Sequence, residues 1–184
     1  STTIKEELPE NYFAPAALPD SAYTALAKNY QSTIPTEVIS NDDLHNILNA
    51  AILAPSGGNC QPWKFVYEQG RLFLFHDLSA SYSFLDYKSY GAYVAFGAVI
   101  QNIEIRSQSL GYNVDVDATP IENKDNHLIA VISFTKANQQ LIHPLNTTIE
   151  VRNTNRNIGL RTSLKPELVS ELKTSIQNIG NDTR

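Results

Sequence analysis

The pattern of apolar and polar residues predicts an amphipathic helix from Ser40 to Leu53. One stripe at helical spacing is formed by Leu44, Ile47, Leu48 and Ala51. Ser40 can accept a hydrogen bond from an early backbone N–H, and Asp43 follows three residues later, much as in a capping box. Pro55 ends the helix, because the residue before a proline disfavours the α conformation.

Three further helices are expected. A short helix from Asp20 to Tyr30 follows an arm rich in Pro and acidic residues, and a long helix runs from about Ser89 to Leu110 with Gly111 as its C-terminal stop. The last helix begins near Pro166, a residue that is favoured in the first turn. Its apolar face consists of Leu168, Val169, Leu172 and Ile176.

The remaining apolar stretches predict four strands. Trp63–Glu68 and Arg71–His76 form a hairpin around a Gln-Gly turn, and Tyr112–Val116 and His127–Phe134 are two more strands. Residues 77–86 are expected to form a polar and aromatic loop. The sum of these elements predicts an α+β fold in which helices cover a central sheet.

The long helix contains many small residues, namely Gly91, Ala92, Ala95, Gly97 and Ala98. A glycine inside a helix costs about 1 kcal/mol relative to alanine, so two of them need a reason. One interpretation is a buried central helix that needs close neighbours. A second interpretation, compatible with the first, is that the helix packs at a two-fold or pseudo-two-fold interface.

Composition excludes several classes of protein. Of the 184 residues 42% are hydrophobic and 18% charged, which is a globular composition. The net charge of -5 disfavours nucleic acid as a partner. The single Cys60 allows no internal disulfide and favours a reducing, cytoplasmic location, and the four histidines have no metal-ligand spacing. No apolar run is long enough to span a bilayer, so no membrane partner is expected.

The loop from Ala54 to Trp63 is the strongest candidate for chemistry. Ser56 and Asn59 are short polar side chains, Gly57-Gly58 allows the backbone to approach a ligand closely, and Gln61 could bond another polar edge. These features suit a flat ring with a polar rim, such as a flavin. On composition alone, an ordinary helix-to-strand turn rich in Gly and Pro is the simpler interpretation.

The order of residues in this loop changes that balance. Ala54, Pro55, Ser56, Asn59, Gln61, Pro62 and Trp63, placed after an amphipathic helix and before a hairpin, resemble the signature of the nitroreductase-like superfamily. The resemblance covers roughly residues 40–135. It implies a three-layer α+β fold with a central antiparallel sheet and a long central helix. It also implies a homodimer with flavin mononucleotide (FMN) at the interface.

The activity that the resemblance implies is an FMN-dependent oxidoreductase. Hydride would pass from NADH or NADPH to the flavin and then to a small acceptor such as a nitroaromatic compound or a quinone. Because the cofactor carries this chemistry, no catalytic side chain is expected. Two alternatives remain open: a protein that stores FMN without turnover, and an accessory half without flavin.

The phosphate clamp of the family is missing from its expected place. No arginine precedes Arg71, and Lys28 is a weak substitute because it lacks the guanidinium fork. A later segment could clamp a phosphate by charge-assisted bonds, although a solvated basic patch is the simpler interpretation of the spacing alone. Its candidate ligands are Arg152, Thr154, Asn155 and Arg156.

A weak internal repeat links this segment to the first helix. A shift of 124 residues aligns Asn29 with Asn153, Ile34 with Ile158, Leu44 with Leu168 and Leu48 with Leu172. We therefore expect an N-terminal arm and short helix (1–39), a first nitroreductase-like half (40–146) and the truncated start of a second half (147–184). This plan resembles the fused branch of the superfamily, in which one polypeptide mimics the dimer. A chain that starts with Ser and contains no Met also fits a processed or truncated piece.

In this plan one flavin site combines the loop of the first half with the basic segment of the second. The loop residues expected to contact FMN are Pro55, Ser56, Gly57, Asn59 and Gln61.

Overall fold

The computed structural model describes residues 18–81, 86–118, 127–159 and 162–180. The chain divides into two compact units, Ser1–Arg152 and Asn153–Arg184. Within the described residues, the first unit contains α1 (Asp20–Asn29), α2 (Asn41–Ala51), β1 (Trp63–Glu68), β2 (Arg71–His76), α3 (Leu78–Ser81), α4 (Tyr90–Ser109), β3 (Tyr112–Ala118) and β4 (Leu128–Lys136). Its short 3-10 turns are η2 (Gly57–Asn59), η3 (Tyr87–Ser89) and η4 (Asn146–Thr148). The second unit contains α5 (Pro166–Gly180).

The sheet has four strands in the order β1-β2-β4-β3, and every neighbouring pair is antiparallel. The predicted hairpin is confirmed, with strand bounds identical to those expected. Its turn residues Gln69 and Gly70 both have positive φ, +50° and +77°. Tight two-residue hairpins need this left-handed conformation at both positions, because it matches the twist of the strands.

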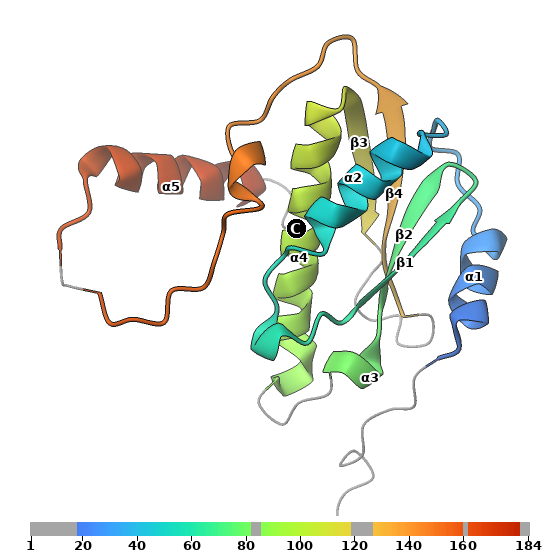
Figure 1. Ribbon diagram of the computed structural model, residues 1–184, viewed down its shortest axis with the longest axis horizontal. Coiled ribbons are helices and arrows are strands. Elements are labelled where there is room, and N and C mark those ends of the chain that lie inside the picture. The colour runs from blue at the N-terminus through green and yellow to red at the C-terminus, as the bar shows by residue number, and fades with distance from the viewer. Residues whose placement is uncertain (1–17, 82–85, 119–126, 160–161, 181–184) are drawn as a thin grey trace, which may run out of the picture. The chain divides into compact units, whose positions relative to one another are not determined.

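Helices cover both faces of the sheet, α2 and α4 on one face and α1 on the other (Figure 1). Leu72 and Leu74 of β2 pack in the cluster formed with α2 and α4, whereas Phe73 and Phe75 pack with Tyr23 of α1. Successive side chains of a strand point to opposite faces, so an unbroken apolar strand fills two layers of core. The predicted three-layer α+β architecture is therefore confirmed in the first unit.

The cap of α2 is confirmed in part. Ser40 Oγ accepts a hydrogen bond from Asp43 N at 3.1 Å. The Asp43 carboxylate does not complete a capping box, because it accepts a bond from Tyr112 Oη at 2.7 Å. Asp43 therefore joins α2 to β3, a link across 69 residues that the local pattern does not contain.

The prediction of a loop over residues 77–86 was wrong for Leu78–Ser81, which form α3. Asp77 Oδ1 accepts hydrogen bonds from Ser79 N at 3.1 Å and from Ala80 N at 3.3 Å. An aspartate in this position caps the first turn of a helix. Residues 82–85 lie outside the described residues.

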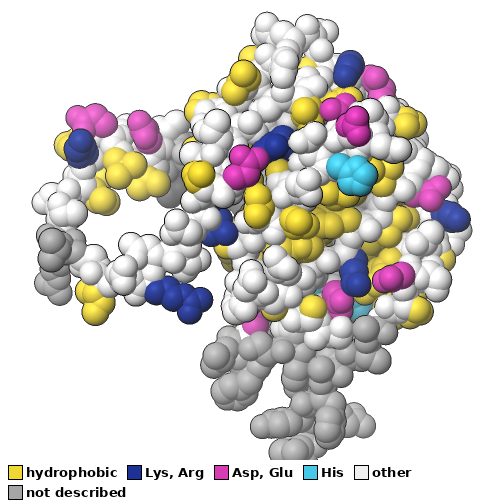
Figure 2. Space-filling model, viewed as in Figure 1, with side chains coloured by type: hydrophobic (Ala, Val, Ile, Leu, Met, Phe, Trp, Pro, Cys, Tyr) yellow, Lys and Arg dark blue, Asp and Glu magenta, His cyan; other side chains and the backbone are white. Residues whose placement is uncertain are grey.

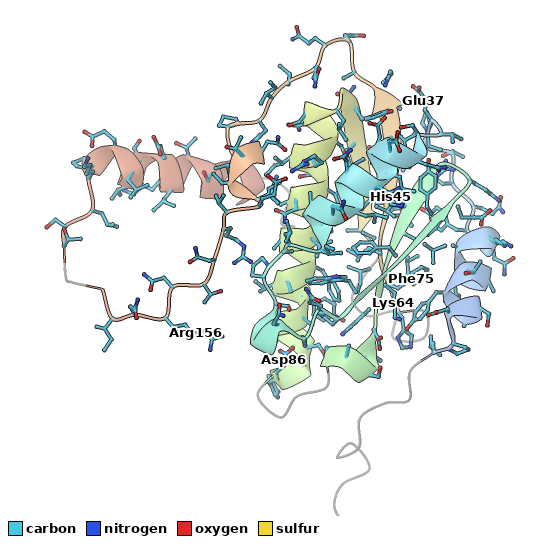
Figure 3. All side chains as sticks on the ribbon, viewed as in Figure 1. Glu37, His45, Lys64, Phe75, Asp86 and Arg156 are labelled. Atoms are coloured by element: carbon cyan, nitrogen blue, oxygen red, sulfur yellow. The ribbon has the colours of Figure 1, made fainter. Side chains whose placement is uncertain are left out.

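The long helix α4 is confirmed, with Gly111 at φ +83° beyond its end. The expected buried central helix is confirmed, because Ala92, Ala95 and Phe96 are buried, but its two glycines are exposed and do not contribute to that packing. Gly91 leaves room for the carboxylate of Asp86, which caps the start of α4 by accepting bonds from Gly91 N (2.7 Å) and Ala92 N (3.0 Å) (Figure 3). A Cβ at Gly97 would meet no atom of the described residues within 4 Å, so Gly97 lies on an open face.

The final helix, predicted to begin near Pro166, is confirmed as α5. Its apolar stripe lies at the surface, with Leu168 43% and Leu172 51% exposed, and Figure 2 shows hydrophobic side chains along it. The side chain of Ile176 lies outside the described part of the chain. Among the helices described in both units, none is long and apolar enough to cross a membrane.

Candidate functional site

The loop predicted to carry the chemistry starts where α2 ends. Leu53 N and Ala54 N donate to Ala50 O (3.2 Å) and Ala51 O (3.1 Å), so the chain turns tightly out of the helix. Ala54 is buried, and Pro55 then leads the chain to the surface. The loop entrance is therefore fixed to the core by the last turn of α2.

The loop exit is fixed to the sheet. Pro62 is fully buried and Trp63 is 8% exposed. Pro62 O accepts a hydrogen bond from Asp77 N at 2.8 Å, which continues the ladder beyond the Trp63–His76 pair. Pro62 and Trp63 therefore lock the loop exit into the strand.

Between these anchors the loop has an unusual backbone. Gly58, Asn59 and Gln61 have positive φ values of +59°, +58° and +47°. Gly and Asn tolerate this region, but it is unfavourable for Gln. Two bonds compensate: Ser56 Oγ accepts from Gln61 N at 2.9 Å, and Gln61 Nε2 donates to Ile52 O at 3.4 Å. Ser56 and Gln61 therefore maintain the loop from within.

The outer side of the loop is open. Gly57, Gly58 and Asn59 are exposed, and a Cβ at either glycine would meet no described atom within 4 Å. No hydrogen bond from the described residues engages the Asn59 side-chain amide, and the Ser56 hydroxyl retains its own proton for donation. This set of groups is polar but neutral, which suits the uncharged rim of a ring and not a phosphate.

The predicted phosphate ligands fall in both units. Arg152 is the last residue of the first unit, and its Nη2 donates to Leu53 O at 3.2 Å, beside the loop entrance. Thr154, Asn155 and Arg156 belong to the second unit and are exposed in the segment before α5, where Figure 3 labels Arg156. The phosphate role of these residues stays a prediction.

His76 is a buried histidine beside the loop exit, and the sequence alone indicated no role for it. His76 is 3% exposed, and its Nε2 lies 2.6 Å from Ser81 Oγ. Burial, and after it the positive charge of His127, lower the pKa of His76 from 6.5 to about 4, although Asp77 and Asp86 act in the opposite direction. The His76 ring packs edge-on against Phe96 and Tyr93, with ring centroids 5.0 Å and 6.0 Å away.

Arg106 of α4 is a second side chain that sequence reasoning missed. It is largely buried and donates to Asn146 Oδ1 at 3.0 Å and to Glu150 Oε1 at 2.5 Å. The partners lie 40 and 44 residues away, so no spacing rule identifies them. The signal that could have found it is the cost of burying a cation, which demands an acidic or carbonyl partner.

One stretch of the chain is similar to a known protein family. Residues 35–71, which span α2, the loop and β1, match the Nitroreductase family. The predicted resemblance to the nitroreductase-like superfamily is confirmed for this stretch. A Mycobacterium tuberculosis protein provisionally named NAD(P)H nitroreductase acg is 28% identical over 104 residues, which is 56% of this chain and 31% of that protein.

Two other relatives share part of the sequence. The M. tuberculosis protein MT1398, named as uncharacterized, is 30% identical over 151 residues, 80% of this chain and 20% of its own length. An Archaeoglobus fulgidus protein, provisionally named NADH dehydrogenase/NAD(P)H nitroreductase, is 54% identical over 33 residues, 18% of this chain and 19% of that protein. This nitroreductase-like chain thus spans less than a third of the length of these relatives.

Solved structures of nitroreductases also align with the chain. Nitroreductase A from Vibrio parahaemolyticus aligns with a TM-score of 0.45 at 14% identity, covering 89% of this chain and 86% of that one. A provisionally named nitroreductase from Desulfovibrio desulfuricans, crystallised with FMN, aligns with a TM-score of 0.48 at 18% identity, covering 78% of this chain and 98% of that one.

Proposed function

We propose that the loop Ala54–Trp63 binds the ring of FMN, and that the protein containing this chain is an FMN-dependent oxidoreductase of the nitroreductase type. The observation that carries this proposal is the geometry of the loop, which is fixed at both ends and presents free neutral groups outward. A rigid site of this kind can hold a flat, uncharged ring without reorganising when it binds.

Each loop residue has a separate part in this proposal. The backbone at Gly57, the Ser56 hydroxyl and the Asn59 amide would hold the polar rim of the ring, and exposed Pro55 would border it. Gln61 would act indirectly, because its backbone and side chain are bonded within the loop and to α2. When bound, FMN supplies the acceptance and donation of hydride, so the chain needs to bind, orient and shield but not to ionise.

The phosphate end of FMN needs positive charge, which the loop lacks. Arg156 supplies a guanidinium group close in sequence to Thr154 and Asn155, and guanidinium groups bind phosphate in two-bond geometry. We propose Arg156, with Thr154 and Asn155, for this role. Arg156→Ala should weaken FMN binding, and an unchanged affinity would assign the segment to the solvated surface.

The proposed electron donor is NADH or NADPH, and the proposed acceptor is a small nitroaromatic or quinone-like compound. The resemblance to the superfamily supports both. Purified full-length protein should absorb in the flavin band, lose that band under anaerobic NADH or NADPH, and regain it when the acceptor is added. A band that neither nicotinamide bleaches would indicate flavin storage, and absence of flavin would contradict the proposal.

A loop variant tests the ring site directly. Asn59→Gly removes the free amide and keeps the left-handed backbone, so FMN affinity should fall by about ten-fold, the value of one well-placed hydrogen bond. Gln69→Gly is the matched control, because it removes an exposed amide from a left-handed position in the hairpin turn. Equal affinities of the two variants would argue against contact between Asn59 and the ring.

We further propose that the open face of α4 packs against a second nitroreductase-like half, in a homodimer or in the same polypeptide. Tyr90 (62% exposed), Val94 (76% exposed) and Gly97 follow one stripe of this helix. A glycine inside a helix lowers its stability relative to alanine, and the close approach of a partner is a reason to keep one at this position. Gly97→Gln should therefore lower FMN content and, for a homodimer, the sedimenting mass. Unchanged values for both would reject this interface.

A further inference from the structure

The carbonyl groups at the C-terminal end of α2 and just beyond it, from Ala50 to Leu53, are bound by side chains from three separate parts of the first unit. Carbonyls at a helix C-terminus carry partial negative charge, so a cation is the strongest partner for them. Arg152 is the one cation in this set. The bonds are Asn102 Nδ2 to Ala50 O (2.9 Å), Gln61 Nε2 to Ile52 O (3.4 Å) and Arg152 Nη2 to Leu53 O (3.2 Å).

Arg152 is the last residue of the segment 145–152, which we name the strap. The contacts of the other strap residues hold Arg152 in place. The strap is fixed by one buried apolar side chain, by the Arg106 side chain and by its own backbone. Its orientation is therefore set before any ligand binds. The contacts are Ile149 (6% exposed) with Ala50 and Ile105, Arg106 with Asn146 and Glu150, and Arg152 N to Thr148 O at 2.9 Å.

We infer that Arg152 is a positioning residue for the flavin loop and not a ligand of the flavin phosphate. Leu53 lies two residues before Pro55, so its carbonyl sets where the loop begins. The neighbouring carbonyl of Ile52 receives the Gln61 side chain, which supports the unfavourable backbone of the loop. If this part of the chain shifted, the carbonyls of Ile52 and Leu53 would move together, and the bond that holds the Gln61 side chain would move with them. The strap thus links α4, through Arg106, to the entrance of the loop that is proposed to contact the flavin ring, through Arg152.

This inference rests on the proposed flavin site, and two flavins can test it. FMN and riboflavin share the ring, but riboflavin lacks the phosphate. In the full-length protein, Arg152→Ala should weaken both flavins by the same factor, about five-fold for one charge-assisted bond at an exposed site. Arg152→Lys should recover most of the loss, because lysine keeps the charge and one donor. Lys173→Ala is the control, since it removes an exposed positive charge from α5.

Glu150→Gln provides a variant that cannot be confused with a phosphate ligand. It removes an acidic partner of Arg106 and leaves every cation of the strap in place. Because Glu150 is 58% exposed, the effect should be small, about two-fold, and again equal for FMN and riboflavin. Loss of FMN affinity alone in Arg152→Ala would overturn the inference and return Arg152 to the phosphate.

Amide hydrogen exchange separates failure of the inference from failure of the proposed function. If the wild-type protein binds neither flavin, the flavin site is rejected, and the positioning role is still measured in the free protein. Arg152→Ala should then speed exchange of the Asn59 and Cys60 amides, which are bonded to Ser56 O and Gly57 O. Unchanged exchange at both amides would overturn the positioning role.

Discussion

Helices α2 and α5 carry similar apolar stripes in opposite surroundings. In α2, Ile47 and Ala51 are fully buried against α4 and the sheet. In α5, Leu168 and Leu172 are about half exposed. Their sequences align at a shift of 124 residues, so the same periodicity leads to a buried face in one unit and an open face in the other. Periodicity therefore determines that a helix forms and which side is apolar, but not what covers that side.

The comparison also supports the proposed second half. A helix whose stripe is exposed gains little from folding, because most helical stability comes from packing of the apolar face. If α5 corresponds to α2, its stripe should pack on a long helix like α4 in that second half. The proposed pairing through α4 and the exposed stripe of α5 are two separate features that call for the same kind of partner.

The largest expected difference between the two helices is in how much one residue of the apolar stripe contributes to the free energy of unfolding. Ile47→Ala should lower the free energy of unfolding by about 3 kcal/mol, because it opens a cavity in a closed core. Leu172→Ala should change it by less than about 0.5 kcal/mol, as expected for an exposed site. Urea denaturation measures both. A large loss for Leu172→Ala would show that α5 is covered and that the contrast is false.

Acid should weaken the first unit, which holds the four histidines, through His76 in particular. Its pKa falls from 6.5 in the unfolded chain to about 4, so between these values the unfolded state binds the proton and the folded state does not. The contribution of His76 to stability is therefore constant above about pH 6.5, falls by about 3 kcal/mol as the pH drops toward 4, and is constant again below that.

Urea midpoints at pH 7 and pH 4.5 check this window. His76→Gln should flatten the pH dependence, because glutamine cannot take up the proton and can still bond to Ser81. His45→Gln is the control, since His45 is exposed on α2. A pH dependence that survives in His76→Gln would assign the transition to another group.

The smallest expected effect concerns the start of each helix. Ser40→Ala removes the N-cap of α2 and should cost about 1 kcal/mol. Ser163→Ala, in the exposed segment ahead of α5, should have no measurable effect on unfolding or on helix content by circular dichroism. An equal loss in the two variants would mean that Ser163 has a capping role of its own.

The predictions that succeeded rest on short-range chemistry. The Ser40 cap, the stop before Pro55, the Gln-Gly hairpin turn and Gly111 beyond α4 all involve residues within a few positions of one another. The predictions that failed, or were absent, concern pairs far apart in the chain. Asp43 with Tyr112 and Arg152 with Leu53 are separated by 69 and 99 residues.

The loop shows the same division on a small scale. Its motif was sufficient to predict a tight turn, because Gly57-Gly58 and Asn59 tolerate unusual backbone conformations, and the flavin contact stays a prediction. The motif did not distinguish groups that face outward, such as Asn59, from groups bonded inward, such as Gln61. Nor did it indicate that Arg152 reaches the entrance of this loop.

The sequence by itself determined the helices and strands, the turn chemistry and the family signature, because these depend on torsion preferences and on bonds between near neighbours. The tertiary structure alone decided which helix face is covered, where the Gly97 face opens, and which carbonyl Arg152 binds. Those outcomes depend on which surfaces exclude water together and on which buried polar groups must find partners, and both conditions are met only when distant segments pack.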